Sequence, residues 1–261
     1  MIRIQGASVH PLVLMLAGLS LLLVVCSLVG SIGLSPAILV GVLPAPLEWQ
    51  IWYEVRLPRL LLAVLVGSTL AAGGTAMQGL FRNPLADPTL LGQASGAGLA
   101  VSIWVVLVNG RLPGFELYGQ FFAGFIGALL VTVVIFRIGR GNRGRESTIT
   151  LLLAGLVINT LTGAVGGILA YIASEEQLRQ LSLWGMGSLS SAQWSTLSVA
   201  CLVLPPALWV LARCASDLDL FQLGEMSAHA AGLNADRLKS RVVLASSLGV
   251  GLCVALTGII G

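Results

Sequence analysis

Side chains that could carry chemistry are few and scattered along this chain. The only lysine, Lys239, stands in RLKSR, whereas a phosphate-binding P-loop needs Gly-Lys followed by Ser or Thr. The two histidines, His10 and His229, have no Cys or His neighbour at metal-ligand spacing. No nucleophile–base arrangement is visible either. We therefore predict no catalytic residue, no metal site and no cofactor in this chain, which is not an enzyme on its own.

A polar segment, RNPLADPTLLGQASGAG at residues 82–98, interrupts a long apolar run. Residues that precede proline avoid the helical region, so Asn83-Pro84 and Asp87-Pro88 end the preceding helix. Irregular backbone near membrane depth is tolerated only where protein or water satisfies it, which indicates an inward-facing gate. A plain cytoplasmic turn is the alternative. The GxxxG pattern from Gly92 to Gly96 predicts close backbone packing of the next helix.

The composition indicates a membrane protein. Hydrophobic residues make up 56% and charged residues 10% of the 261, with a mean hydropathy of +0.95, whereas soluble domains carry about 25% charged residues. The net charge of +3 comes without a basic stretch interleaved with aromatics, so we predict no nucleic-acid partner. The four cysteines are scattered singly and predict apolar packing rather than disulfides.

Seven apolar windows reach the roughly 20 residues that a spanning helix needs. They predict an all-α, polytopic transmembrane bundle that forms a single domain over 1–261. No charged residue lies near the middle of a window, which argues against a proton-coupled carrier. The segment 35–57, with three prolines and three aromatics, suits the headgroup level. The windows are 12–33, 58–81, 89–108, 119–138, 149–173, 193–212 and 242–261.

Basic residues set the orientation. With a cytoplasmic N-terminus, ten of them fall inside and four outside, in agreement with the positive-inside rule. The inside set is Arg3, Arg82, Arg137, Arg140, Arg143, Arg145, Arg213, Arg237, Lys239 and Arg241; the outside set is Arg56, Arg59, Arg111 and Arg179.

The longest inside segment, 213–241, mixes polar residues with an apolar spacing suited to short helices. It predicts an amphipathic helical hairpin that either tucks against the bundle or docks into a groove of a soluble partner. The expected apolar face comprises Leu220, Leu223, Ala228 and Ala231, with breaks at Gly224 and Gly232.

Two arginines stand on the outer side in RLPR, residues 56–59, against the usual bias. Pro58 suits the first turn of the helix that follows, where its missing N–H costs nothing. Arg56 and Arg59 are either snorkelling anchors or a cationic docking point for an acidic partner.

RLPRLLLAVLVGSTLAAGGTAMQGLFRNPLADPTLLGQASGAG resembles the signature of permease subunits of bacterial ABC importers for iron–siderophores, haem and vitamin B12. LLLAG (151–155), LRQLSLWGMGSLS (178–190) and LFQLGEMSAHAAGL (220–233) follow in the order and spacing of that family. The resemblance covers nearly all of residues 50–261.

The resemblance implies ten helices per subunit and two paired permease subunits, identical or not. It further implies two cytoplasmic ATPases that bind ATP and Mg, and a periplasmic binding protein, with the permease in lipid in the inner membrane. The last window ends without a polar flank, so we expect a piece of a longer chain. The cargo would be an iron–siderophore, haem or cobalamin, the first two favoured. The alternative is a secondary transporter or channel-like protein that works without ATPases.

Site residues follow from the same resemblance. Arg56 and Arg59 match arginines that pair with glutamates of the binding protein, and the helix that begins at Thr148 matches one that lines the path. The gate residues would be Asn83, Leu85 and Thr148. The residues that couple to the ATPase, within the cytoplasmic segment 213–241, would be Leu223, Gly224, Glu225, Ala228 and Gly232.

Overall fold

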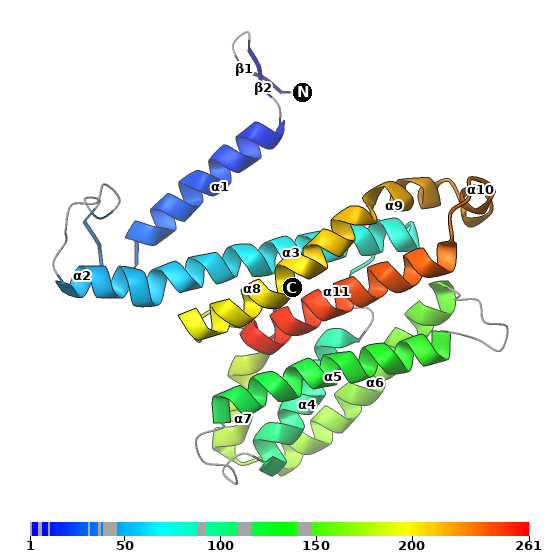
Figure 1. Ribbon diagram of the computed structural model, residues 1–261. Helices are drawn as coiled ribbons and strands as arrows, with labels where there is room; N and C mark the ends of the chain where they lie inside the picture. Colours follow the sequence, from blue (N-terminus) through cyan, green and yellow to red (C-terminus); the bar gives the residue numbers. More distant parts are fainter. Residues whose placement is uncertain are drawn as a thin grey trace. The chain divides into compact units, whose positions relative to one another are not determined.

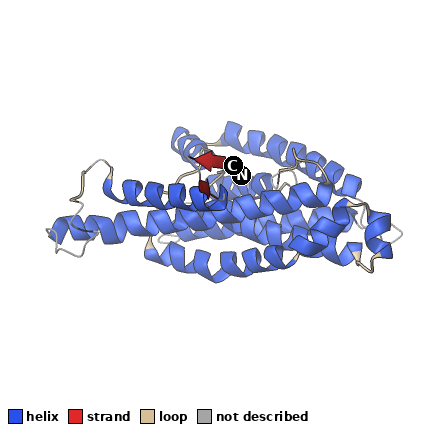
Figure 2. Cartoon of the chain, turned by 90° about the horizontal axis from the view of Figure 1, so that it is seen from above, coloured by secondary structure: helices blue, strands red, loops and turns tan. Residues whose placement is uncertain are grey.

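The structure is a computed structural model. It describes residues 2–4, 7–9, 11–30, 32–35, 38, 46–87, 92–108, 116–139 and 148–260. Nearly all of these residues are helical, as predicted (Figure 2). The chain forms two compact units, one of residues Met1–Val64 with Ala192–Leu197 and the other of Leu65–Ser191 with Ser198–Gly261.

The first unit begins with the one departure from the all-α prediction among the described residues. Two short strands, β1 (Ile2–Ile4) and β2 (Ala7–Val9), pair antiparallel with Ile4 opposite Ala7. They lead into α1 (Pro11–Leu28), which confirms the first apolar window as a helix (Figure 1).

The second predicted span starts earlier than its sequence suggests. One continuous helix of 36 residues runs from Pro46 to Phe81 as α2 (Pro46–Gln50), η2 (Ile51–Arg56) and α3 (Leu57–Phe81). The π-helical turn η2, just before Pro58, explains how this continuous helix accommodates the proline. The Leu57 N–H bonds the Trp52 carbonyl five residues back, so the hydrogen bonds already depart from the α-helical pattern at this point. The next residue, Pro58, has no N–H to donate. Pro58 lies in the first turn of α3, as predicted, but α3 continues a helix that already begins at Pro46.

Aromatic side chains cluster on the first turns of this helix. Trp49 stacks on Tyr53 with ring centroids 6.1 Å apart, and Tyr53 lies 5.0 Å from Trp194. The Trp194 indole N–H donates to the Tyr53 carbonyl at 3.1 Å. Such a cluster resembles the aromatic belts of membrane proteins. The expectation that segment 35–57 lies at the headgroups stays a prediction, and its described end is helical and continuous with the span.

The remaining helices belong to the second unit, except for the first turn of α8, which belongs to the first. Six helices of the described chain are long and apolar enough to cross a membrane; the window 89–108 gives only a shorter one, Gln93–Val108. The elements are α4 (Gln93–Ile103), η4 (Trp104–Val108), α5 (Glu116–Gly139), α6 (Thr148–Ile172), α7 (Glu175–Gly185), α8 (Trp194–Arg213), α9 (Ala215–Gln222), α10 (Glu225–Ala230) and α11 (Ala235–Thr257).

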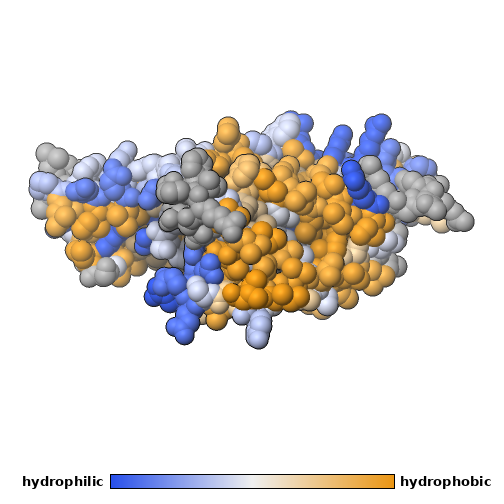
Figure 3. Space-filling model, turned by 90° about the horizontal axis from the view of Figure 1, so that it is seen from below, coloured by the Kyte–Doolittle hydropathy of each residue, from blue (hydrophilic) through white to orange (hydrophobic). Residues whose placement is uncertain are grey.

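Helix α11 is the most enclosed of the spans, with 78% of its most apolar stretch buried, and it packs against α4 and α5. It begins at Ala235, seven residues before the predicted window, because Asn234 caps it by accepting the Arg237 N–H at 3.0 Å. By contrast, α6 exposes an apolar face of Leu153, Leu156, Val157, Leu161 and Ile168. Figure 3 shows one side of the molecule on which apolar residues form a broad continuous area. Such a surface suits lipid or another membrane subunit.

Glycines let α4 approach α5 at backbone distance, which confirms the packing predicted from the GxxxG pattern. A Cβ on Gly96 would lie 2.7 Å from the Gly127 carbonyl oxygen of α5. Gly92, left-handed at φ +75°, caps α4 beside Asn159 near the middle of α6; a Cβ there would lie 3.1 Å from Asn159 Oδ1. Helix α4 therefore begins about halfway along its neighbour α6.

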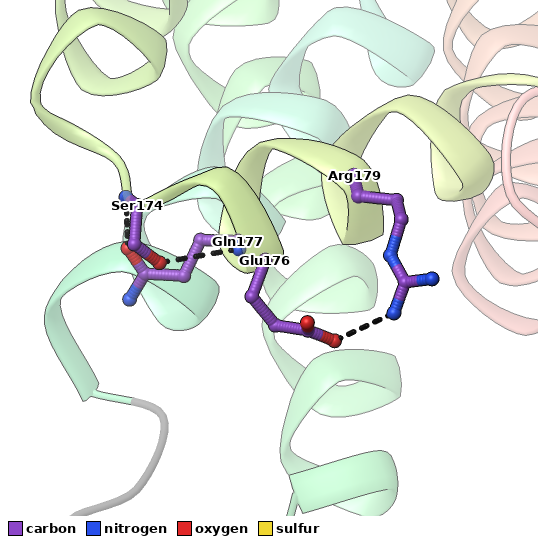
Figure 4. Close-up of polar contacts among 4 residues, drawn as sticks. All are labelled: Ser174, Glu176, Gln177 and Arg179. Carbon is purple, nitrogen blue, oxygen red and sulfur yellow. Dashed lines mark hydrogen bonds and ion pairs between the residues drawn. The ribbon is translucent and has the colours of Figure 1, made fainter.

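The amphipathic helix α7 has a complete capping box, shown in Figure 4. The Ser174 hydroxyl accepts the Gln177 backbone N–H at 3.3 Å, and the side-chain oxygen Oε1 of Gln177 accepts the Ser174 backbone N–H at 2.9 Å. The Gln177 amide also donates to the Val105 carbonyl at 3.0 Å, in the wide turn η4. Thus one side chain both starts α7 and satisfies the end of η4.

Gly96→Ala is expected to destabilise the second unit by about 1–3 kcal/mol, because the added methyl must push α4 away from the α5 backbone. Gly163→Ala is the matched control, since nothing lies within 4 Å of a Cβ there. Thermal unfolding in detergent micelles, followed by tryptophan fluorescence, measures both. Equal midpoints for the two variants would contradict the backbone contact.

Candidate functional site

The polar segment after α3 opens with a helix stop built on an unusual residue. The Asn83 N–H bonds the Gln78 carbonyl at 3.2 Å and the Arg82 N–H faces the Gly79 carbonyl at 3.4 Å, the two bonds of a Schellman motif. Arg82 holds the left-handed position, φ +50°, where glycine is usual, and is the only non-glycine with positive φ among the described residues. An L residue there costs about 1–2 kcal/mol. The predicted break in the helix is confirmed.

Asn83 then fixes the following turn. Its side-chain oxygen accepts the Leu85 N–H at 3.0 Å, and its carbonyl accepts the Ala86 N–H at 3.0 Å. Ala86 is buried, whereas the Leu85 side chain is 85% exposed. Two of the expected gate residues therefore share one turn, with Leu85 projecting from it. Thr148 is the first residue of α6; its side chain, like Pro88 of this segment, lies outside the described residues.

The expected helical hairpin within 213–241 is present as α9 and α10, followed by the start of α11. Its predicted apolar face is only partly right, because Ala228 is buried but Leu220, Leu223 and Ala231 are exposed. The buried face is instead formed by Leu218, Phe221 and Ala228. The i, i+3 spacing of Leu218 and Phe221 was the available signal. Leu223, 72% exposed, and Met226, 89% exposed, project away from the core.

Two glycines make the corners of this hairpin. Gly224, φ +110°, is the N-cap of α10, and Gly232, φ +89°, follows the end of α10. Both conformations are ones that glycine alone adopts readily. Between α10 and the start of α11 lies an open cavity of about 610 Å³, lined among others by Glu225, His229 and Asp236.

Glu225, at the first position of α10, forms an ion pair with Lys239 of α11 at 2.8 Å. The lysine side chain is 2% exposed and the glutamate 52%. A buried ammonium needs an anionic or hydrogen-bonding environment, so the pair holds α10 to α11. Glu225 therefore stabilises the contact between α10 and α11, in addition to being an expected coupling residue.

Arg56 is engaged inside the first unit. Its guanidinium donates to the carbonyls of Ser27 at 2.9 Å and Leu28 at 2.7 Å, and also to Ile32, around the C-terminal end of α1. Gly30 leaves space for this guanidinium, since a Cβ at Gly30 would lie 2.7 Å from Arg56 Nη2. The arrangement satisfies terminal carbonyls of α1. Of the two expected docking residues, Arg59 is exposed and Arg56 half-buried.

Polar contacts between helices were missed by the sequence reasoning. Gln93, fully buried, donates from its amide to the Ser247 hydroxyl at 2.7 Å, and Ser95 bonds Asn159 Oδ1. These contacts join the start of α4 to the middles of α11 and α6. Isolated Gln, Ser and Asn residues in apolar windows were the only signal, and such residues commonly bond across membrane helices.

The four cysteines lie apart from one another and differ in exposure. Cys214 and Cys253 are buried and Cys26 and Cys201 exposed, all as free thiols. Burial raises the pKa of the Cys214 thiol, opposed in part by Arg241 and assisted by Asp217. At neutral pH Cys214 therefore stays protonated and is a poor nucleophile.

A bundle of apolar helices with a broken helix and an exposed helical hairpin at its end defines a multi-span membrane permease. The chain belongs to the FecCD transport family, whose profile matches residues 15–261. It is 47% identical over 253 residues to the hemin transport system permease protein of Yersinia pestis, covering 95% of this chain and 75% of that one.

Two further proteins, a vitamin B12 import permease and a solved ABC transporter structure, also match this chain. The vitamin B12 import system permease of Klebsiella pneumoniae is 39% identical over 211 residues, which cover 81% of this chain and 61% of the relative. A solved structure described as an inward-facing conformation of a metal-chelate type ABC transporter matches with a TM-score of 0.81 at 31% identity. The match covers 97% of this chain and 78% of that one. The chain thus spans less than two thirds of the Klebsiella permease.

Glu225→Gln is expected to lower the free energy of unfolding by about 1–3 kcal/mol, because it removes the anionic partner of a buried ammonium. Lys239→Met should cost less, since it removes the buried charge and leaves a carboxylate that water can reach. Glu176→Gln is the control, because its pair with Arg179 is exposed on both sides and worth at most about 1 kcal/mol. Chemical denaturation in micelles measures all three. A larger loss for Lys239→Met than for Glu225→Gln would refute this assignment.

Proposed function

We propose that this chain is the permease subunit of an ATP-driven importer that carries haem, or another large iron or cobalt chelate, across the bacterial inner membrane. Paired permease subunits would form the path, two cytoplasmic ATPases would bind ATP and Mg, and a periplasmic protein would deliver the cargo. The N-terminus would be cytoplasmic.

One observation carries the proposal: the hairpin of α9 and α10 exposes two large apolar side chains, Leu223 and Met226, while an ion pair between Glu225 and the buried Lys239 holds α10 to α11. Exposed apolar side chains on a short, braced hairpin are what a helix needs to dock into a groove of a partner. In Figure 1 this hairpin lies at the same end of the second unit as the end of α3 and the ends where α5 stops and α6 starts. These are the ends that the basic residues assign to the cytoplasm.

In the proposed mechanism, closure of the ATPases displaces α9 and α10, and the displacement opens and closes a gate formed by Asn83, Leu85 and Thr148. The exposed apolar face of α6 would meet the second permease subunit or line the path between the two. On the outer side Arg59 would contribute positive charge to docking of the binding protein, while Arg56 holds the end of α1 in place.

Replacing Leu223 and Met226 together by Asp should reduce co-purification of the ATPase at least about tenfold, because two apolar anchors are lost from the interface. Tyr171→Asp is the matched control, since Tyr171 is as exposed as Met226 but lies at the far end of α6. Subunit ratios after affinity purification report the result. A wild-type permease that transports with no nucleotide-binding partner would instead establish a secondary transporter.

Haem is the first cargo to test, because the hemin permease of Yersinia pestis is the more similar of the relatives described above. We expect this chain, supplied with its ATPase and binding protein, to restore uptake of labelled haem in a strain that lacks its own permease. Labelled ferric siderophore and cobalamin are run in parallel. Restored cobalamin uptake without haem uptake would overturn the cargo assignment and leave the importer intact.

A further inference from the structure

The ring of Phe221 is a meeting point of three helices. Phe221, on α9, is 1% exposed and belongs to one apolar cluster with Met77 and Leu80 of α3 and Leu238 of α11. Nearby, Leu218 of α9 packs onto Gly79, where a Cβ would lie 3.6 Å from the leucine. Close-packed interiors transmit displacement rather than absorb it. Helix α9 is therefore seated on the last turn of α3.

Two cations from different elements approach the same ring. Arg82 Cζ lies 5.7 Å and Lys239 Nζ 5.8 Å from the Phe221 centroid, both within cation–π range. Lys239 also bonds Glu225 at 2.8 Å, so the contacts run from α10 through α11 and α9 to the residue that ends α3.

The backbone of Arg82 supports a role for its side chain. Glycine would hold the left-handed position without strain, whereas arginine places a guanidinium there, against Phe221 and beside the α10 N-cap; a Cβ on Gly224 would lie 3.9 Å from Arg82 Nη1. Strained positions persist where the surroundings gain from them. The next residue, Asn83, then holds Leu85 in its turn.

We propose that Arg82, Phe221, Glu225 and Lys239, here named the linking cluster, join α9 and α10 to the turn after α3 as one rigid body. A displacement of α10 then carries Asn83 and Leu85 with it. This inference rests on the proposed function, in which a partner ATPase moves α10. It adds Arg82 and Phe221 as positioning residues that connect the ATPase-docking hairpin to the gate.

Spin labels test the rigid body directly. The full complex of permease, ATPase and binding protein is reconstituted in nanodiscs with the exposed Cys26 and Cys201 replaced by Ser; Cys214 and Cys253 are buried. Labels at Leu85→Cys and Met226→Cys, both highly exposed positions, report the distance between turn and hairpin. A second pair, at Met226→Cys and Tyr171→Cys, reports whether α10 moves within the bundle.

We expect vanadate trapping to shift the Met226–Tyr171 distance while the Leu85–Met226 distance keeps a single unchanged peak. Arg82→Gly should split or broaden that peak and reduce the stimulation of ATP hydrolysis by the binding protein at least about fivefold. Because glycine relieves the backbone strain at this position, the effect would not stem from unfolding. Arg82→Lys, which keeps a cation, should retain most of both readouts.

Trp209→Leu is the matched control. It removes the cation–π contact between Trp209 and Arg213, whose Cζ lies 4.6 Å from the ring centroid. Both residues belong to α8, so this contact joins no two elements. Both readouts should stay as in the wild type.

The outcomes separate the two proposals. A wild-type Leu85–Met226 distance that changes on trapping, or an Arg82→Gly variant that keeps the narrow peak and full stimulation, overturns the linking cluster. A Met226–Tyr171 distance that does not respond to trapping overturns the ATPase-driven function on which it rests.

Discussion

Backbone N–H and C=O groups at the end of a helix lose their partners within the helix, so each break between helices must supply other partners. The described breaks in this chain do so by different means. Arg56 donates to carbonyls at the end of α1, Gln177 bonds the end of η4 while it caps α7, and the Schellman motif closes α3 at Arg82 and Asn83. These local hydrogen bonds stabilise the points at which the helices stop, so the chain can break its helices there.

The long helices were readable from the sequence because length and hydropathy alone decide them. The residues at which these helices begin and end were harder to predict. Pro58 normally marks a helix start, but the wide turn at Ile51–Arg56 carries the helix past it. Ala235 starts α11 seven residues before the apolar run, because a cap at Asn234 decides the start and hydropathy does not. The shortness of α4 follows from where Gly92 meets α6, a tertiary contact that no local pattern contains.

The candidate site divides in the same way. The break at Asn83 and the hairpin at 213–241 followed from proline, glycine and apolar spacing, so the sequence located both. Which side of the hairpin is buried depended on its packing against α3, which lies far from it in sequence, and against α11, and the predicted face missed Phe221. The pairing of Lys239 with Glu225 spans a turn of the chain at Gly232 and could not be read from spacing. The roles of the gate and coupling residues rest on family resemblance and stay predictions.

Within residues 1–261 the sole lysine has its ammonium sealed between α10 and α11. Amine-directed cross-linkers and lysine-specific proteases therefore find no ready target on these folded residues apart from a free amino terminus. In a mixture with other subunits, such reagents would mark the companions and leave this stretch almost untouched. Reaction at that position would then serve as a chemical signal that the hairpin has parted from the bundle.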